Sequence, residues 1–302
     1  MVIAGKLGPS GFGLLVLALA VSKLLAEASD LGLDYGLLRL GSISYGQGDT
    51  GRFRAIVGRG IVGALLAGAV AGLALAAGAS LVAELFHKSD LTTVLVPLAL
   101  SVPFTGTTEV ARAALRAMGD ARRPVASSSI IAPSLRLITG IWAVSSSPSA
   151  TAAAWAYLAT EALVFLITTS MLWRQLPPAV HGSATVDGLF RFSLPMSLNR
   201  ILLYSNNQTE IVLLGILTPS ATVGIFGVAR RLSALVGALL TSVSTLFNPI
   251  VADLHHSRRT EELDQLFRTS TRWVVTVGLP LCLVEFLFAP DILGIIGSGF
   301  SS

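Results

Sequence analysis

The stretch from Gly60 to Ala83 reads GIVGALLAGAVAGLALAAGASLVA and decides the fold class. It carries no charged residue, and a hydrocarbon core about 30 Å thick needs roughly 20 apolar helical residues to span it. Small residues recur at every fourth position, on one face of a helix, which favours close packing against another helix within a membrane. These positions are Gly60, Ala64, Gly68, Gly72, Ala76 and Ser80.

The whole composition indicates that lipid is the solvent of this chain. Of its 302 residues, 53% are hydrophobic and only 13% are charged, whereas soluble domains carry about a quarter charged residues. We therefore predict an all-α, polytopic membrane helix bundle with about eight transmembrane helices. The predicted spans are 11–33, 58–86, 91–117, 125–145, 150–173, 190–217, 221–251 and 270–296.

Charge and cysteine content argue against several other functions. The net charge is +4, but the basic excess lies in short loops rather than on one face interleaved with aromatic residues, so no nucleic-acid partner is expected. The single cysteine, Cys282, lies in an apolar run and is expected to be a core residue. No phosphate-binding glycine loop ending in Lys and Ser or Thr is present. We expect no cofactor, no metal site and no enzyme activity; an ion gradient or substrate supply would drive transport.

The basic residues gather in alternate loops, and such a bias sets the orientation of a membrane protein. The loops on one side of the membrane have only two basic residues, Lys6 and Lys88, and we call this the poor side. The loops on the other, rich side carry many arginines, so we expect that side to be cytoplasmic and both ends of the chain to face outward. Four of these arginines are expected to anchor this topology and contact anionic lipid: Arg112, Arg116, Arg122 and Arg123. The rich side carries Arg39, Arg52, Arg54, Arg59, Arg112, Arg116, Arg122, Arg123, Arg174, Arg191, Arg258, Arg259, Arg268 and Arg272.

An internal repeat divides the chain. The segment Pro9–Leu15 (PSGFGLL) parallels Pro219–Phe226 (PSATVGIF), and Phe53-Arg54 later parallels Phe267-Arg268. A full span precedes the second copy but not the first, so we expect a helix to be missing before residue 1 and the carboxyl end to be truncated. We assign residues 1–173 to an amino-terminal lobe, 174–189 to a cytoplasmic linker rich in Pro and Gly, and 190–302 to a partial carboxyl-terminal lobe. Two such repeats are typical of transporters that rock one lobe against the other.

Short motifs in the second lobe add a family resemblance. Their order and spacing resemble the Wzx-type flippases of O-antigen and exopolysaccharide, in the MATE-like exporter superfamily. This resemblance implies a two-lobe, inverted-V fold that moves undecaprenyl-diphosphate-linked oligosaccharide from the cytoplasmic to the outer leaflet of the bacterial inner membrane. It also implies membrane lipids and a polysaccharide polymerase as partners. The motifs are Phe192–Pro195, Glu210–Gly215, Val223–Phe226, Ala229–Leu232 and Phe247–Pro249, with a looser match at Leu115–Gly119.

Charged residues inside the spans are the candidate site, because each costs at least about 2.5–3.5 kcal/mol in hydrocarbon without a partner or water. Lys23, Glu27, Asp30 and Asp34 follow one helical stripe, and Lys23 is positioned to pair with Glu27. We interpret the stripe as facing a cavity; the alternative is an internal ion pair that only neutralises itself.

The span 190–217 carries the most polar face of the chain. Asn199, Asn206 and Glu210 share a stripe, while Arg200 and Asn207 lie further around the helix. Lipid offers no hydrogen bonds, so this face should line a substrate pathway or form a structural network.

Three arginines complete the candidate set, because planar guanidinium groups bind a diphosphate in a bidentate way. They are Arg136, Arg230 and Arg231. Since Arg230 and Arg231 point about 100° apart, we expect only one of them to reach the cavity while the other snorkels or pairs with Glu161 or Glu210. The predicted substrate-binding residues are Arg200, Arg230, Arg231, Arg136, Lys23, Asn206 and Asn207; Glu27, Asp30, Glu161 and Glu210 are assigned to ion coupling or structural pairing.

Three alternatives to the flippase interpretation stay open. A cation-coupled multidrug or metabolite exporter of the same superfamily would favour acids over arginines, whereas the predicted spans hold five basic residues against the four assigned carboxylates. A membrane glycosyltransferase would need a large outward loop, and the outward connectors are short. The chain could also be an inactive fragment.

Overall fold

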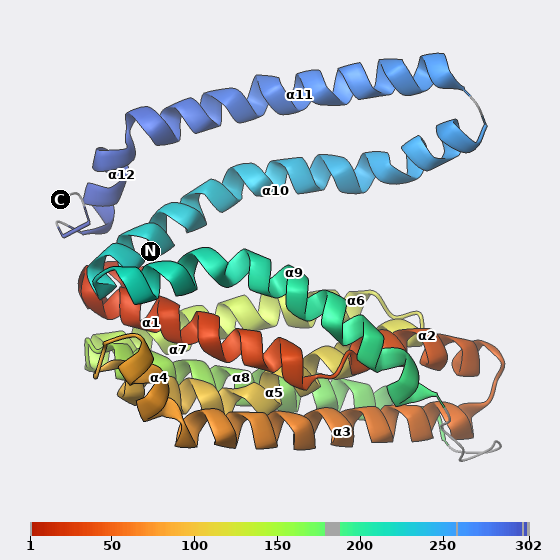
Figure 1. Cartoon of the computed structure of the whole chain (residues 1–302). Coiled ribbons are helices and arrows are strands. Elements are labelled where there is room, and N and C mark those ends of the chain that lie inside the picture. The colour runs from red at the N-terminus through yellow and green to blue at the C-terminus, as the bar shows by residue number, and fades with distance from the viewer. Residues whose placement is uncertain (1, 179–187, 258, 298, 301–302) are drawn as a thin grey trace.

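A computed structural model describes residues 2–178, 188–257, 259–297 and 299–300, and every regular element within these ranges is helical (Figure 1). Arg258 and the middle of the predicted linker, 179–187, lie outside the described residues. The elements are α1 (Val2–Ser29), α2 (Leu33–Gly46), α3 (Thr50–Ala77), α4 (Ala79–Leu85), α5 (Leu91–Ala117), α6 (Arg122–Val125), the π-helical turn η1 (Ala126–Ile131), α7 (Ala132–Ser146), α8 (Ala150–Gln175), α9 (Leu189–Leu217), α10 (Ser220–His256), α11 (Thr260–Leu287) and α12 (Ala289–Ile296).

The predicted helical membrane bundle is confirmed. Six helical segments among the described residues are long and apolar enough to cross a membrane, and the pair α1 and α2 counts as one of them. The helices α9 and α10, with 29 and 37 residues, fall outside that set but are also long enough to span. Two predicted spans are broken internally, 58–86 at Gly78 and 270–296 at Phe288, which separates α11 from α12. The predicted span 11–33 runs past the end of α1 at Ser29 into the start of α2.

The small-residue ridge of α3 packs against α5, as predicted for its first four positions. Gly60, Ala64, Gly68 and Gly72 are buried, and a Cβ atom added at Gly68 would lie only 2.7 Å from the Cα atom of Pro103. The close approach therefore depends on the absence of a side chain. The prediction is wrong for Ser80, which is exposed on α4 because the helix breaks at Gly78.

The two repeat segments cross each other near the starts of α1 and α10. A Cβ atom on Gly13 would lie 2.9 Å from the backbone nitrogen of Gly224, and one on Gly224 would lie 3.0 Å from the nitrogen of Gly13. Gly13 also faces the carbonyl of Ser220, while Gly224 faces that of Pro9. The contact is thus reciprocal between equivalent positions of the repeat, as an approximate two-fold axis requires.

Beyond this crossing, α10 leaves the bundle while α9 stays with it. The helix α9 packs along α1 and α2, and α11 packs chiefly against α10; Figure 1 shows α10 and α11 extending away from the other helices. The side chains of Trp273 and Phe286 on α11 are 67% and 80% exposed. Cys282 is exposed as well, so its assignment to a core was wrong, because α11 has few protein neighbours.

The two basic residues of the charge-poor side lie at the same end of the bundle. The Lys6 ammonium donates to Ser145 Oγ at 2.7 Å. The Lys88 ammonium, in the turn before α5, donates to the carbonyls of Gly215 and, at 3.0 Å, of Thr218. It therefore caps the carboxyl end of α9. Burial lowers the pKa of Lys88.

Candidate functional site

Two cavities adjoin the same face of α1 and share the side chains of Leu19, Lys23 and Arg231. We call them the first and second chambers. The first, of about 340 Å³, lies between α1, α7, α8 and α10; the second, of about 240 Å³, lies between α1, α9 and α10. Phe12, Arg136, Leu137, Thr139, Tyr157 and Thr160 also line the first; Tyr204, Gln208, Ile211, Gly227 and Arg230 also line the second.

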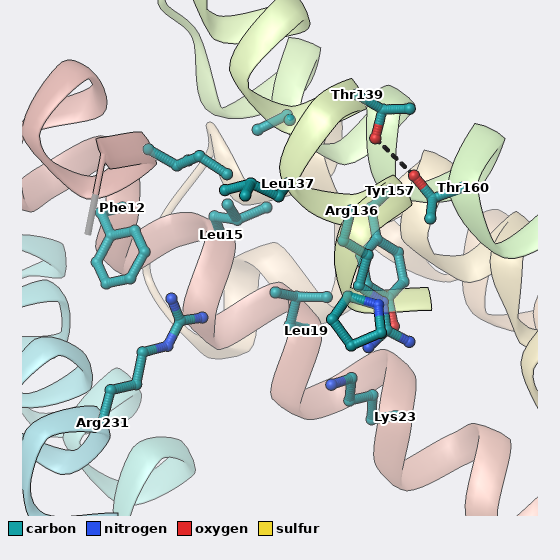
Figure 2. A pocket seen from close by; sticks show the side chains of 14 residues that line it. Phe12, Leu15, Leu19, Lys23, Arg136, Leu137, Thr139, Tyr157, Thr160 and Arg231 are labelled. Carbon is teal, nitrogen blue, oxygen red and sulfur yellow. Dashed lines mark hydrogen bonds between the residues drawn. The ribbon is translucent and has the colours of Figure 1, made fainter. Parts of the chain in front are cut away.

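Cations surround one aromatic ring in the first chamber (Figure 2). The Lys23 ammonium lies 6.0 Å and the Arg136 guanidinium 5.5 Å from the centre of the Tyr157 ring, within range of cation–π attraction. Nε and Nη2 of Arg136 both donate to Glu161 Oε1, at 2.9 and 2.7 Å. The buried Glu161 thus fixes Arg136 at the wall of the chamber.

Adjacent arginines of α10 line the second chamber. The Arg231 guanidinium lies 5.0 Å from the ring centre of Phe12, while Arg230 donates to the carbonyl of Asn207 and, at 3.5 Å, to Gln208 Oε1. The prediction that only one arginine reaches the cavity is therefore wrong. The reason is that two chambers adjoin this face of α1: Arg230 lines the second chamber, and Arg231 lines both.

The charge of the two chambers is unbalanced. In the described part of the chain, no carboxylate lies within ion-pair distance of Lys23, Arg230 or Arg231. The predicted Lys23–Glu27 pair is wrong, because Glu27 binds Arg200 instead. An unpaired cation at membrane depth is costly, and an anionic ligand would offset that cost.

Arg200 belongs to a separate cluster, where α1 breaks into α2. Its guanidinium binds Glu27, Asp30 at 2.9 Å and Asp34 at 2.6 Å, and it lies 5.8 Å from the ring centre of Tyr35. Three carboxylates meet one cation, and Asp34 Oδ1 has no hydrogen-bond partner among the described residues. Arg200 lines neither chamber, so the structure does not bring it to the other predicted substrate-binding cations.

The backbone explains how α9 reaches this cluster. Leu31 and Gly32 have φ angles of 55° and 65°, which end α1 and start α2. Asp30 Oδ1 accepts a hydrogen bond from the Gly32 N–H at 2.8 Å, which holds the turn. A Cβ atom on Gly32 would lie 2.9 Å from the Ser197 nitrogen, so glycine is needed both for the turn and for the approach of α9.

The predicted polar stripe of α9 faces away from both chambers. Its members Asn199, Asn206 and Glu210 are exposed and line neither cavity. Asn207, further around the helix, is exposed as well, although its carbonyl accepts a hydrogen bond from Arg230. The face that points to α1 instead carries Arg200, followed at helical spacing by Tyr204 and Gln208. Periodicity identified stripes on this helix but could not say which one meets α1.

Some site features were not identified from the sequence. Tyr157 lies one turn before Glu161 on α8, a spacing that could have indicated it. Arg112, predicted to contact lipid, is instead buried: it binds Glu109, and its Nε donates to Ser127 Oγ at 3.2 Å. Ser127 lies in η1, a π-helical turn with no recognisable signal in the sequence.

The comparisons with known proteins agree with this architecture. The pattern of one family, described as polysaccharide biosynthesis protein, matches residues 2–300. The chain belongs to this family of Wzx-like flippases. Family and fold are those of membrane exporters rather than enzymes, which confirms the resemblance predicted from the motifs. A search of curated proteins found no match.

Two solved structures share the fold of this polysaccharide biosynthesis family member. One is an inward-facing conformation of a multidrug resistance MATE family transporter of the MOP superfamily, with a TM-score of 0.80 and 16% identity, covering 100% of this chain and 71% of that one. The other is the MATE multidrug transporter DinF-BH in a ligand complex, with a TM-score of 0.69 and 16% identity, covering 97% and 68%. At this identity the likeness concerns the fold alone. The predicted MATE-like architecture is confirmed.

Proposed function

We propose that this protein moves a polyprenyl-diphosphate-linked oligosaccharide across the bacterial cytoplasmic membrane, from the cytoplasmic to the outer leaflet. The observation that carries the proposal is the set of cations without a carboxylate partner among the described residues, Lys23, Arg230 and Arg231, in two chambers that share side chains. A diphosphate headgroup supplies the anionic charge that these chambers lack. The polyprenyl tail would stay in the surrounding lipid.

The helix arrangement supports alternating access to these chambers. At the end of the bundle that carries Lys6 and Lys88, α1 and α10 touch at Gly13 and Gly224. Toward the arginine-rich end, α10 diverges from the bundle (Figure 1). With the arginine-rich end cytoplasmic, as the charge bias predicts, this conformation is closed outward and admits a headgroup from the cytoplasm. Rocking of the two lobes would then expose it to the other side.

A multidrug exporter with cationic substrates is the second candidate, because both similar structures are described as multidrug transporters. Unpaired cations in the chambers would repel such substrates. The carboxylates that could attract them, Glu27, Asp30 and Asp34, are occupied by Arg200. The charge distribution therefore favours the anionic substrate.

Reconstitution into proteoliposomes tests the proposal. A fluorescent polyprenyl-diphosphate saccharide in the vesicles should become accessible to a membrane-impermeant quencher faster than in protein-free vesicles, and Arg231→Ala should slow this exchange. Arg272→Ala, on the exposed surface of α11, serves as the matched control and should not. Export of a cationic dye without any effect on the lipid would instead support the multidrug function.

A further inference from the structure

Tyr157 is a polar residue of the first chamber, and attraction between cations and a diphosphate does not account for it. Its hydroxyl is buried, yet it has no hydrogen-bond partner among the described residues. A buried hydroxyl without a partner is destabilising because it has lost its hydrogen bonds to water, and such groups are rare in folded proteins. A ligand that accepts a hydrogen bond at this point would remove that cost.

The neighbouring polar groups already have partners. The hydroxyls of Thr139 and Thr160 bind each other at 2.6 Å (Figure 2). Arg136 is held by Glu161. Glu161 lies one turn from Tyr157 and is near enough to attract its hydroxyl hydrogen, but in this conformation the two groups do not reach the distance and angle of a hydrogen bond. In this conformation the Tyr157 hydroxyl is therefore available as a donor to a ligand in the first chamber.

A second donor lies beside it. The Lys23 ammonium is 6.0 Å from the centre of the Tyr157 ring, and the part of the chain that the structure describes gives it neither a hydrogen-bond acceptor nor an ion-pair partner. In the second chamber, by contrast, Arg230 already donates to Asn207 and Gln208. Lys23 lines both chambers, whereas Tyr157 lines only the first, so these two donors come together in the first chamber.

We propose that the Tyr157 hydroxyl and the Lys23 ammonium together bind one phosphate group of the substrate, which places that phosphate in the first chamber. This inference rests on the proposed function and deepens it. Phosphate oxygens accept hydrogen bonds from several directions, so one group can serve both donors. Arg231 lines both chambers and is available to a second, linked phosphate, which predicts selectivity for diphosphates over monophosphates.

Binding of geranylgeranyl diphosphate to the purified full-length protein in detergent tests the inference. Tyr157→Phe removes only the hydroxyl and should weaken binding about tenfold, the effect of one hydrogen bond to a charged group. Its thermal stability should equal or exceed that of the wild type, because an unpaired buried hydroxyl is lost. Tyr45→Phe is the matched control: Tyr45 is exposed at the other end of the bundle, against Phe53, and binding should not change.

A double-mutant cycle separates direct binding from an indirect effect. If Lys23 and Tyr157 hold the same phosphate, the loss in Lys23→Met/Tyr157→Phe should be smaller than the product of the two single losses. Geranylgeranyl monophosphate should bind more weakly than the diphosphate in the wild type. Equal affinities of wild type and Tyr157→Phe would overturn the inference. Absence of diphosphate binding by the wild type would instead contradict the proposed function.

Discussion

The chambers and the Arg200 cluster are both charged regions at membrane depth, yet their charge balance is opposite. In the chambers, Lys23 and Arg231 have no carboxylate within ion-pair distance among the described residues. In the cluster, Arg200 is shared by Glu27, Asp30 and Asp34. A cation surrounded by carboxylates holds helices together, whereas a cation without a partner is available to a ligand. We therefore propose a structural role for the cation of the cluster and a binding role for the cations of the chambers.

Removing Arg200 should have the largest effect. In Arg200→Met, three carboxylates lose their shared cation, and breaking a buried ion pair in this way costs about 3–5 kcal/mol. Thermal unfolding in detergent should show a large loss of stability. Adding Asp30→Asn and Asp34→Asn should restore much of it, since the repulsion is then removed; failure of this rescue would mean that packing of Arg200, rather than its charge, stabilises the contact of α9 with α1.

Lys23→Met should change binding rather than stability. The ammonium has no carboxylate to leave behind among the described residues, so unfolding should be unaffected or shifted to higher temperature. Binding of geranylgeranyl diphosphate should weaken about a hundredfold, the upper range for a charged hydrogen bond, as isothermal titration calorimetry would show. A loss of stability like that of Arg200→Met would erase the distinction between the two regions.

The crossing of α1 and α10 is expected to separate the chambers from the solution outside the cell. Gly13→Leu places a side chain against Gly224 and Ser220, and such overpacking costs about 2 kcal/mol. A cysteine introduced at Leu19, in a Cys282→Ser background, should then react faster with an impermeant thiol reagent from outside the cell. Gly237→Leu is the matched control on α10, because a Cβ atom there would have no neighbour within 4 Å. Unchanged labelling in Gly13→Leu would argue against the seal.

The smallest effect is expected for Glu161→Gln. Arg136 is 39% exposed in its side chain, so solvent screens its pairing, and we expect a stability loss of about 1 kcal/mol. The change also frees Arg136 toward the first chamber, so diphosphate should bind more tightly at low salt, and the gain should decrease as salt is added. Fluorescence titration at two salt concentrations measures this. Weaker binding in the variant would show that Glu161 orients Arg136 for the ligand.

The sequence alone was enough to predict that the chain lies in a membrane, that it is helical and which family it belongs to. Low charge and long apolar stretches predicted the bundle, because a helix is the structure that satisfies its own backbone in lipid. The paired copies of Pro9–Leu15 and Pro219–Phe226 predicted a repeat, and ordered motifs predicted the family. These features follow from local composition and spacing, which a linear sequence records directly.

Only the tertiary structure decided which charges meet. Arg200 and Asp30 are 170 positions apart, and no periodicity within one helix reveals such a pair. The rotation of α9 against α1 placed Tyr204 and Gln208 in the second chamber and left Asn206 and Glu210 exposed. Close contacts such as that between Gly32 and the backbone of Ser197 set this rotation. Packing between helices, and not the polarity of a single helix, selects the face that turns inward.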